Sequence, residues 1–198
     1  ITSQEAALDT RQSSTIFIPE LAKDILEQIV FEARKSEFVD VKSGVSARLS
    51  ITAFENLVST AERRLLHSGD DKTGIRMSDF TGIIPAITGK IELVYEGEQE
   101  GAYNVALTLL GNAIKSLYSE FFPKIEKIEK QGVESPYDEI VSWFFNHSED
   151  FEILDDISEK DYRSILEKVK PLSEFVLKYQ VGVTPEEVCF WQEFVLWS

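Results

Sequence analysis

The stretch SGVSARLSITAFENLVSTAERR, from Ser43 to Arg64, carries the strongest structural signal in the chain. A turn that contains Gly44 leads directly into a long segment with apolar residues at helical spacing. Gly69 lies just beyond this segment and is expected to cap its C-terminal end. The spacing predicts an amphipathic helix from about 46 to 67, whose buried stripe consists of Ile51, Phe54, Val58, Ala61 and Leu65.

Arg48 falls in the first turn of this predicted helix. A cation at that position opposes the helix macrodipole, at a cost of about a few tenths of a kcal/mol, unless an anion lies nearby. A nucleotide phosphate would meet both the guanidinium and the positive helix end. Ser43, Gly44 and Ser46 would then form the supporting turn. The alternative is a surface arginine paired with a neighbouring glutamate, and physical chemistry alone favours that alternative.

Helical spacing recurs through most of the chain and predicts a mainly α fold. Ser158 with Asp161, and Thr184 with Glu187, are the expected N-terminal caps of two late helices. Further helices are expected at 20–35, at 76–87 with Pro85 limiting it, at 100–130 with a kink at Pro123, at 137–147, 158–169 and 171–180, and from 184 onward.

The segment GKIELVYEGE alternates in part between apolar and polar residues. This pattern predicts one small β-hairpin near 89–97. Such a hairpin either packs on the neighbouring helices or docks on a partner, and the structural role is favoured. The last predicted helix is rich in aromatic residues, which are expected to be core rather than an exposed interaction patch: Phe190, Trp191, Phe194 and Trp197.

A break at 131–136 is the expected domain boundary. It separates a helical lid-like domain at 19–130, which includes the hairpin, from a helical C-terminal extension at 137–198. Residues 1–18 are polar and then briefly apolar, and are expected to form a linker. Because the chain begins without Met and without a signal-peptide pattern, it is expected to be an excised or processed piece.

The charge balance limits the classes of partner. The 198 residues include 35 acidic and 20 basic side chains, for a net charge of -15. Such a surface disfavours nucleic acid and anionic membranes, and no run of about 20 apolar residues is present to span a membrane. Cys189 is the only cysteine, which excludes an intrachain disulfide and fits a cytoplasmic location. Its apolar neighbours favour a core role over a nucleophilic one.

Familiar catalytic motifs are missing from the sequence. It contains no G-x-x-x-x-G-K-[ST] phosphate loop, no G-x-S-x-G elbow and no H-E-x-x-H zinc motif. No catalytic or metal-binding residue is therefore predicted. The remaining polar candidates fit surface, turn or helix-end roles better than chemistry: His67, His147, Asp70-Asp71, Asp155-Asp156, Arg63 and Arg64.

The region around Arg48 resembles the sensor-2 region of AAA+ ATPases of the magnesium-chelatase subunit I-like and MoxR type. In that family a turn of small residues and an arginine open a helix of the lid domain. The likeness covers residues 1–101 well and the remainder more loosely, and Ala47 stands where many relatives have proline. The stretches that carry it are IVFEAR (Ile29–Arg34), SGVSARLS, ENLVSTAERR and SDFTGIIPAITGKIELVYEGE.

The resemblance implies a helical AAA+ lid-type bundle in which Arg48 reaches the γ-phosphate of ATP. Residues 1–18 would link the lid to a missing ATPase core of the same polypeptide. ATP and Mg would belong to that parent protein, so this piece has no cofactor of its own and neither hydrolyses nor tightly binds ATP alone. A ring homo-oligomer and a partner with a von Willebrand A-type domain are also implied. The alternative is a helical protein–protein adaptor without any nucleotide role.

Overall fold

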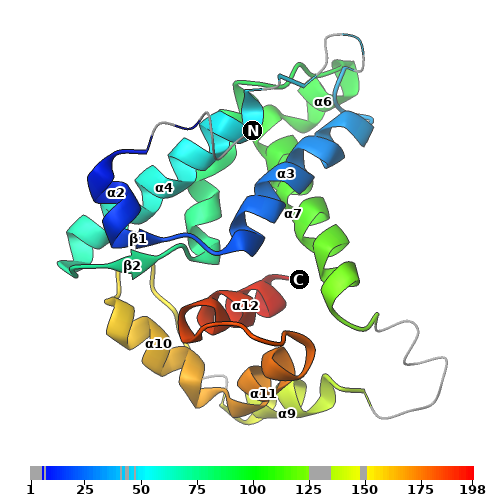
Figure 1. Ribbon diagram of the computed structural model, residues 1–198. Coiled ribbons are helices and arrows are strands. Elements are labelled where there is room, and N and C mark those ends of the chain that lie inside the picture. Colours follow the sequence, from blue (N-terminus) through cyan, green and yellow to red (C-terminus); the bar gives the residue numbers. More distant parts are fainter. Residues whose placement is uncertain are drawn as a thin grey trace.

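The computed structural model describes residues 6, 8–40, 42, 45–46, 48–124, 135–147 and 151–198. The chain is mainly α-helical with one small β element, which confirms the predicted fold class. Figure 1 shows the helices of the first part of the chain above and those of the C-terminal extension below.

The elements before the break pack around two long helices, α4 and α7. Helices α3 and α4 lie close to the expected bounds, and α7 ends at Phe121, before the expected kink at Pro123. In chain order the elements are α2 (Thr10–Thr15), β1 (Ile16–Phe17), α3 (Glu20–Lys35), α4 (Leu49–Ser68), β2 (Thr73–Gly74), the 3-10 helix η1 (Met77–Ile83), α5 (Ile84–Thr88), α6 (Tyr95–Glu100) and α7 (Ala102–Phe121).

The extension contains the three helices predicted at 137–180 and the last helix. Two predicted caps are present, since the Ser158 hydroxyl accepts a hydrogen bond from the Asp161 N–H, and Thr184 and Glu187 form a capping box. Gly69 ends α4 in the left-handed conformation, with φ of 74°. The helices of the extension are α9 (Asp138–His147), α10 (Glu159–Lys168), α11 (Lys170–Tyr179) and α12 (Pro185–Trp197).

The prediction of a β-hairpin near 89–97 is wrong. Ile91 and Leu93 form only isolated antiparallel bridges, to Val45 and Val39, and the chain then turns into helix α6. Extended backbone was therefore expected for the right residues, but its partners lie earlier in the chain. The sheet is instead the parallel pair of β1 and β2.

The linker expected at 1–18 is wrong for its later residues. Asp9 and Gln12 form a capping box that starts α2, and Ile16 is buried where β1 pairs with β2.

The helix predicted at 76–87 also differs, because Pro85 lies in the first turn of α5 and does not limit a helix. Proline fits there, since an N–H in the first turn has no intrahelical acceptor.

One hydrophobic core contains residues from both sides of the predicted boundary at 131–136. Trp191 of α12 packs edge-on against Phe121 of α7, with ring centroids 4.9 Å apart, and Phe190 contacts Phe80 of η1. Phe194 is also buried, so the core role expected for the last helix is confirmed for these three residues, while Trp197 is partly exposed. Residues 131–134 themselves lie outside the described part of the chain.

Within the described ranges, every helix falls short of the length or the apolar content that crossing a bilayer requires.

Gly97 allows α6 to pack directly on the turn that follows α3. A Cβ at this position would overlap the carbonyl oxygen of Phe38. We expect Gly97→Ala to lower the free energy of unfolding by about 1–3 kcal/mol, since overpacking outweighs the higher helix propensity of alanine. Urea denaturation measures the change. Gly111→Ala in α7 is the control, because no atom lies within 4 Å of its added Cβ and stability should rise by about 0.5–1 kcal/mol. Equal effects of the two substitutions would contradict the prediction.

Candidate functional site

Arg48 lies at the N-cap of α4 with its side chain exposed to solvent. Among the described residues, its guanidinium has neither a hydrogen-bond acceptor nor a carboxylate partner. Ser46 shapes the turn, because its Oγ accepts a hydrogen bond from the Arg48 N–H at 3.3 Å and its carbonyl accepts one from the Leu49 N–H at 2.9 Å. Ser43 and Gly44, the other members of the expected turn, lie outside the described residues. The arginine is thus presented outward at the positive end of a long helix.

Arg64, near the other end of α4, is not the helix-end surface charge that the sequence favoured. Its side chain is buried and its nitrogen atoms donate to three different residues. Nη2 donates to Asp79 Oδ2 at 2.8 Å and Nη1 donates to the Thr73 hydroxyl at 2.6 Å. Nη2 also donates to the Gly74 carbonyl at 2.7 Å. Arg63, in contrast, is exposed.

Arg76 is a second buried arginine, and its partners come from the extension. Nη1 donates to the Ile157 carbonyl at 3.1 Å, and Nη2 lies 3.4 Å from Glu159 Oε2. The guanidinium carbon lies 4.2 Å from the ring centroid of Tyr162, a cation–π contact. Burial, and then the charge of Arg64, lower the pKa of Arg76.

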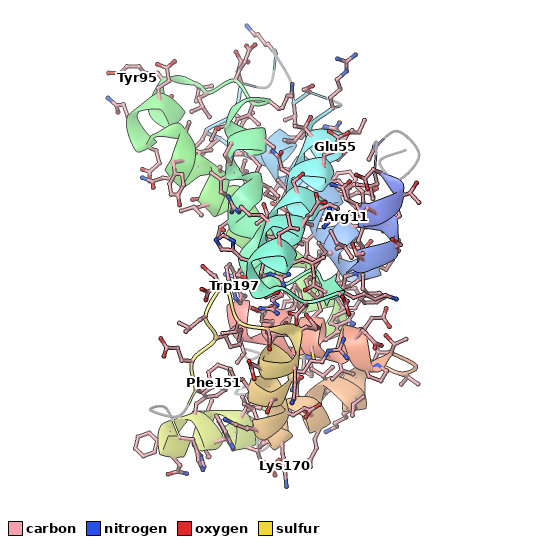
Figure 2. The ribbon with its side chains drawn as sticks, turned by 90° about the vertical axis from the view of Figure 1, so that its left-hand side faces the viewer. Arg11, Glu55, Tyr95, Phe151, Lys170 and Trp197 are labelled. Atoms are coloured by element: carbon pink, nitrogen blue, oxygen red, sulfur yellow. The ribbon has the colours of Figure 1, made fainter. Side chains whose placement is uncertain are left out.

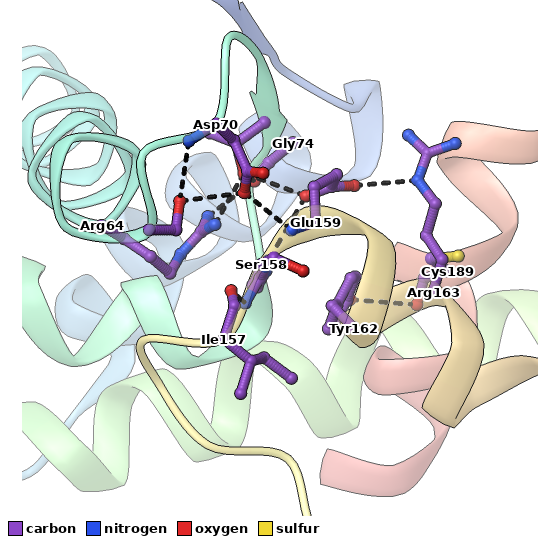
Figure 3. A network of polar contacts seen from close by, with 12 residues as sticks. Arg64, Asp70, Gly74, Ile157, Ser158, Glu159, Tyr162, Arg163 and Cys189 are labelled. Carbon is purple, nitrogen blue, oxygen red and sulfur yellow. Dashed lines mark hydrogen bonds and ion pairs between the residues drawn. The ribbon is translucent and has the colours of Figure 1, made fainter.

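Glu159 links the surroundings of the two buried arginines, because its carboxylate contacts Arg76 and also Thr73, the partner of Arg64. Figure 3 shows Glu159 joined to Arg163 on its other side. Its carboxylate accepts hydrogen bonds from the Thr73 hydroxyl at 3.0 Å and from Arg163 Nε at 3.0 Å, in addition to the contact with Arg76. Burial alone would raise the pKa of Glu159, but these bonds and charges lower it. The Glu159 N–H donates to Asp70 Oδ2 at 2.8 Å, so Asp70 also contacts the extension instead of lying in a solvated turn.

Glu193 of α12 provides a second link between η1 and the extension. Its Oε2 accepts hydrogen bonds from the Met77 N–H at 2.7 Å and from the Tyr162 hydroxyl at 2.9 Å. Burial raises the pKa of Glu193 to about 7, against the lowering effect of these two hydrogen bonds. Glu193 therefore titrates close to neutral pH.

These side chains form a buried polar network that joins β2 and η1 to the extension. Burial raises the pKa of the Cys189 thiol to about 11, so the thiol is protonated at neutral pH and its expected core role is confirmed. His147 is exposed and stacks on Trp143, and His67 is exposed as well. Within the part of the chain that the structure describes, no three histidine, cysteine or acidic side chains lie together as a metal site would require.

Sequence reasoning missed the roles of Arg64, Arg76, Glu159 and Glu193. Their partners lie far away along the chain, up to 116 residues for the bond between Met77 and Glu193. Local spacing carries no signal for such pairs.

Comparison of the chain with protein-family models, with curated proteins and with solved structures gives no match.

We expect Asp79→Ala to lower the free energy of unfolding by about 3–5 kcal/mol. The substitution leaves the charge of Arg64 buried without its carboxylate, and such an uncompensated charge is strongly destabilising. Glu20→Ala is the control, because it breaks the ion pair with Lys23, where the glutamate is largely exposed, and should cost less than about 1 kcal/mol. Urea denaturation of both variants at pH 7 checks the difference. Similar costs would show that the buried pair contributes no more than a surface pair.

Glu193 makes stability depend on pH, with a sign set by its raised pKa. Between its usual value of 4.5 and about 7 the folded chain holds a proton that the unfolded chain has lost, so stability falls as pH rises through this window. This shift of the Glu193 pKa corresponds to a change of about 3 kcal/mol in the free energy of unfolding across the window. Glu193→Gln keeps a carbonyl acceptor for the Met77 N–H and cannot ionise. We expect the variant to lose this decrease and to equal or exceed the native stability at pH 8. Parallel pH profiles of the two proteins in urea would refute the assignment.

Proposed function

We propose that this chain is the lid and C-terminal extension of a cytoplasmic AAA+ ATPase of the magnesium-chelatase-like and MoxR-like type, and that Arg48 senses the bound nucleotide. In this proposal ATP and Mg are held by a core of the same polypeptide. The intact protein forms a ring homo-oligomer and acts on a partner, such as a protein with a von Willebrand A-type domain. The observation that carries the proposal is the exposed guanidinium of Arg48 at the N-terminus of α4, which has no ion-pair partner among the residues that the structure describes.

The chemistry at this position suits a phosphate. A guanidinium forms charge-assisted hydrogen bonds to phosphate oxygens, and the unpaired N–H groups of a helix N-terminus favour the same anion. Without an anion, a cation at this end of a helix is unfavourable. A phosphate that approached from another domain would offset this unfavourable placement of Arg48.

Helix α4 is suited to transmit the movement of Arg48. It has 20 residues, which corresponds to a length of about 30 Å. Leu49, Leu57 and Val58 on its inner face are fully buried. Arg64, near its far end, is bonded to β2 and η1, and these contact the extension through Glu159 and Glu193. A displacement at Arg48 would thus move the lid and the extension together.

The adaptor alternative requires no nucleotide, and the full gene distinguishes the two. A phosphate-binding loop encoded upstream of Ile1 supports the ATPase, whereas its absence supports the adaptor.

We expect Arg48→Ala in the full-length protein to lower ATP turnover by about ten- to a hundredfold, because one charge-assisted hydrogen bond to phosphate contributes about 1.5–3 kcal/mol. Arg48→Lys should restore only part of the activity, since an ammonium lacks the planar fork of the guanidinium. Steady-state ATPase assays measure the effect, and circular dichroism verifies the fold.

Arg63→Ala is the matched control, because Arg63 is exposed on the same helix and should leave turnover unchanged. Turnover of Arg48→Ala equal to that of the Arg63 variant would contradict the sensor role.

A further inference from the structure

One stretch of the surface differs in charge from the rest of the chain. Residues 91–114 contain no lysine or arginine, although the whole chain contains 20 of them. The same stretch contains four glutamates, all of which are exposed: Glu92, Glu96, Glu98 and Glu100. The charged side chains that α6 and the first part of α7 contribute are therefore all negative, while Lys35 of α3 lies beside Thr108 and Asn112.

Large apolar side chains are exposed in this region. Tyr95 on α6 is 67% exposed, and Tyr103 and Leu107 on α7 are 60% and 38% exposed. Tyr103 and Leu107 lie one turn apart on α7, and Gly101, with φ of 92°, separates them from α6. On α6, Gln99 Nε2 donates to the Tyr95 hydroxyl at 3.0 Å. Figure 2 shows Tyr95 at the outer edge of α6. We call Tyr95, Tyr103 and Leu107 the tyrosine face.

The fold itself does not need the tyrosine face. Helix α6 contacts the chain through its opposite side, where Gly97 is buried against the carbonyl oxygen of Phe38. Helix α7 buries Val105 and Leu109 in the core. Both helices are thus held from the inner side, and Tyr95 and Tyr103 are mostly exposed to solvent. Exposed apolar residues with a polar rim are typical of protein interaction sites.

The charges around this face select its partner. A second copy of the chain would bring Glu96, Glu98 and Glu100 of one protomer near an equally acidic surface, and each chain carries a net charge of -15. Nucleic acid and anionic membranes would meet the same repulsion. A segment that is apolar on one side and basic on the other satisfies both the tyrosines and the glutamates.

We propose that the tyrosine face binds a basic amphipathic helix of a partner protein, with the apolar side of that helix on Tyr103 and Leu107 and its lysines or arginines toward Glu96, Glu98 and Glu100. Apolar residues spaced by three or four along the partner helix would anchor it on this face. The site does not depend on Arg48 or on nucleotide, so it can be tested separately from the proposed ATPase role.

The probe is a fluorescent amphipathic peptide of leucine and lysine, about 18 residues or five helical turns long. Fluorescence anisotropy measures its dissociation constant for the 198-residue chain. We expect saturable binding that weakens with added salt, because exposed charges contribute to it. A peptide of the same composition in scrambled order, which lacks the apolar side, should bind at least about tenfold more weakly. Equal binding of the two peptides would mean that only net charge is recognised and would overturn the proposal.

Variants locate the site. Leu107→Ser, and separately the triple substitution of Glu96, Glu98 and Glu100 by glutamine, should each weaken binding of the amphipathic peptide at least about tenfold. The matched controls are Leu177→Ser, since Leu177 is 53% exposed on α11, and glutamine at three exposed glutamates of the extension, namely Glu152, Glu167 and Glu174.

The controls should retain native affinity. Loss of binding in the controls to the same degree, or unchanged binding in the site variants, would refute the proposal. Sedimentation velocity provides a separate measurement, because a dimer that Leu107→Ser dissociates would show that the face binds a second copy instead.

Discussion

The buried ion pair between Arg64 and Asp79 is the interaction on which the polar organisation of this fold depends. An arginine remains charged inside a protein, so each of its donors needs an acceptor. Here the acceptors belong to residues 73–79, which must therefore cross the far end of α4. That crossing places Thr73 and Arg76 where Glu159 contacts both. The position of the extension thus follows in part from neutralising one charge on α4.

Apolar and polar contacts have different roles where the extension meets the rest of the chain. The rings of Phe190, Trp191 and Phe194 bury area against η1 and α7, but such contacts are non-directional. The hydrogen bonds of Glu159 and Glu193 have fixed geometry and select one arrangement among those that bury similar area. Together these contacts hold the extension in one position against β2, η1 and α7.

Features set by neighbouring residues were predictable from the sequence, and features set by distant residues were not. The caps at Ser158 and Thr184 and the end of α4 at Gly69 depend on residues within one turn, and all three were predicted. The hairpin near 89–97 failed because its extended residues pair with Val39 and Val45. Arg64 fits a surface helix end when only its own helix is considered, and its burial depends on Asp79, which lies 15 residues later. The position of Arg48 at the N-terminal end of its own helix, which depends on neighbouring residues, was predicted.

Helix α12 has a consequence for the order of folding during synthesis. It is the last element of the chain described here, yet it provides three aromatic rings of the core and the acceptor for the Met77 N–H. While α12 is still unsynthesised or inside the ribosome, the apolar surfaces on η1 and α7 that it contacts have no cover from it. Such surfaces are the ones that chaperones bind and through which incomplete chains aggregate. These surfaces remain without cover until α12 has left the exit tunnel and packed against them.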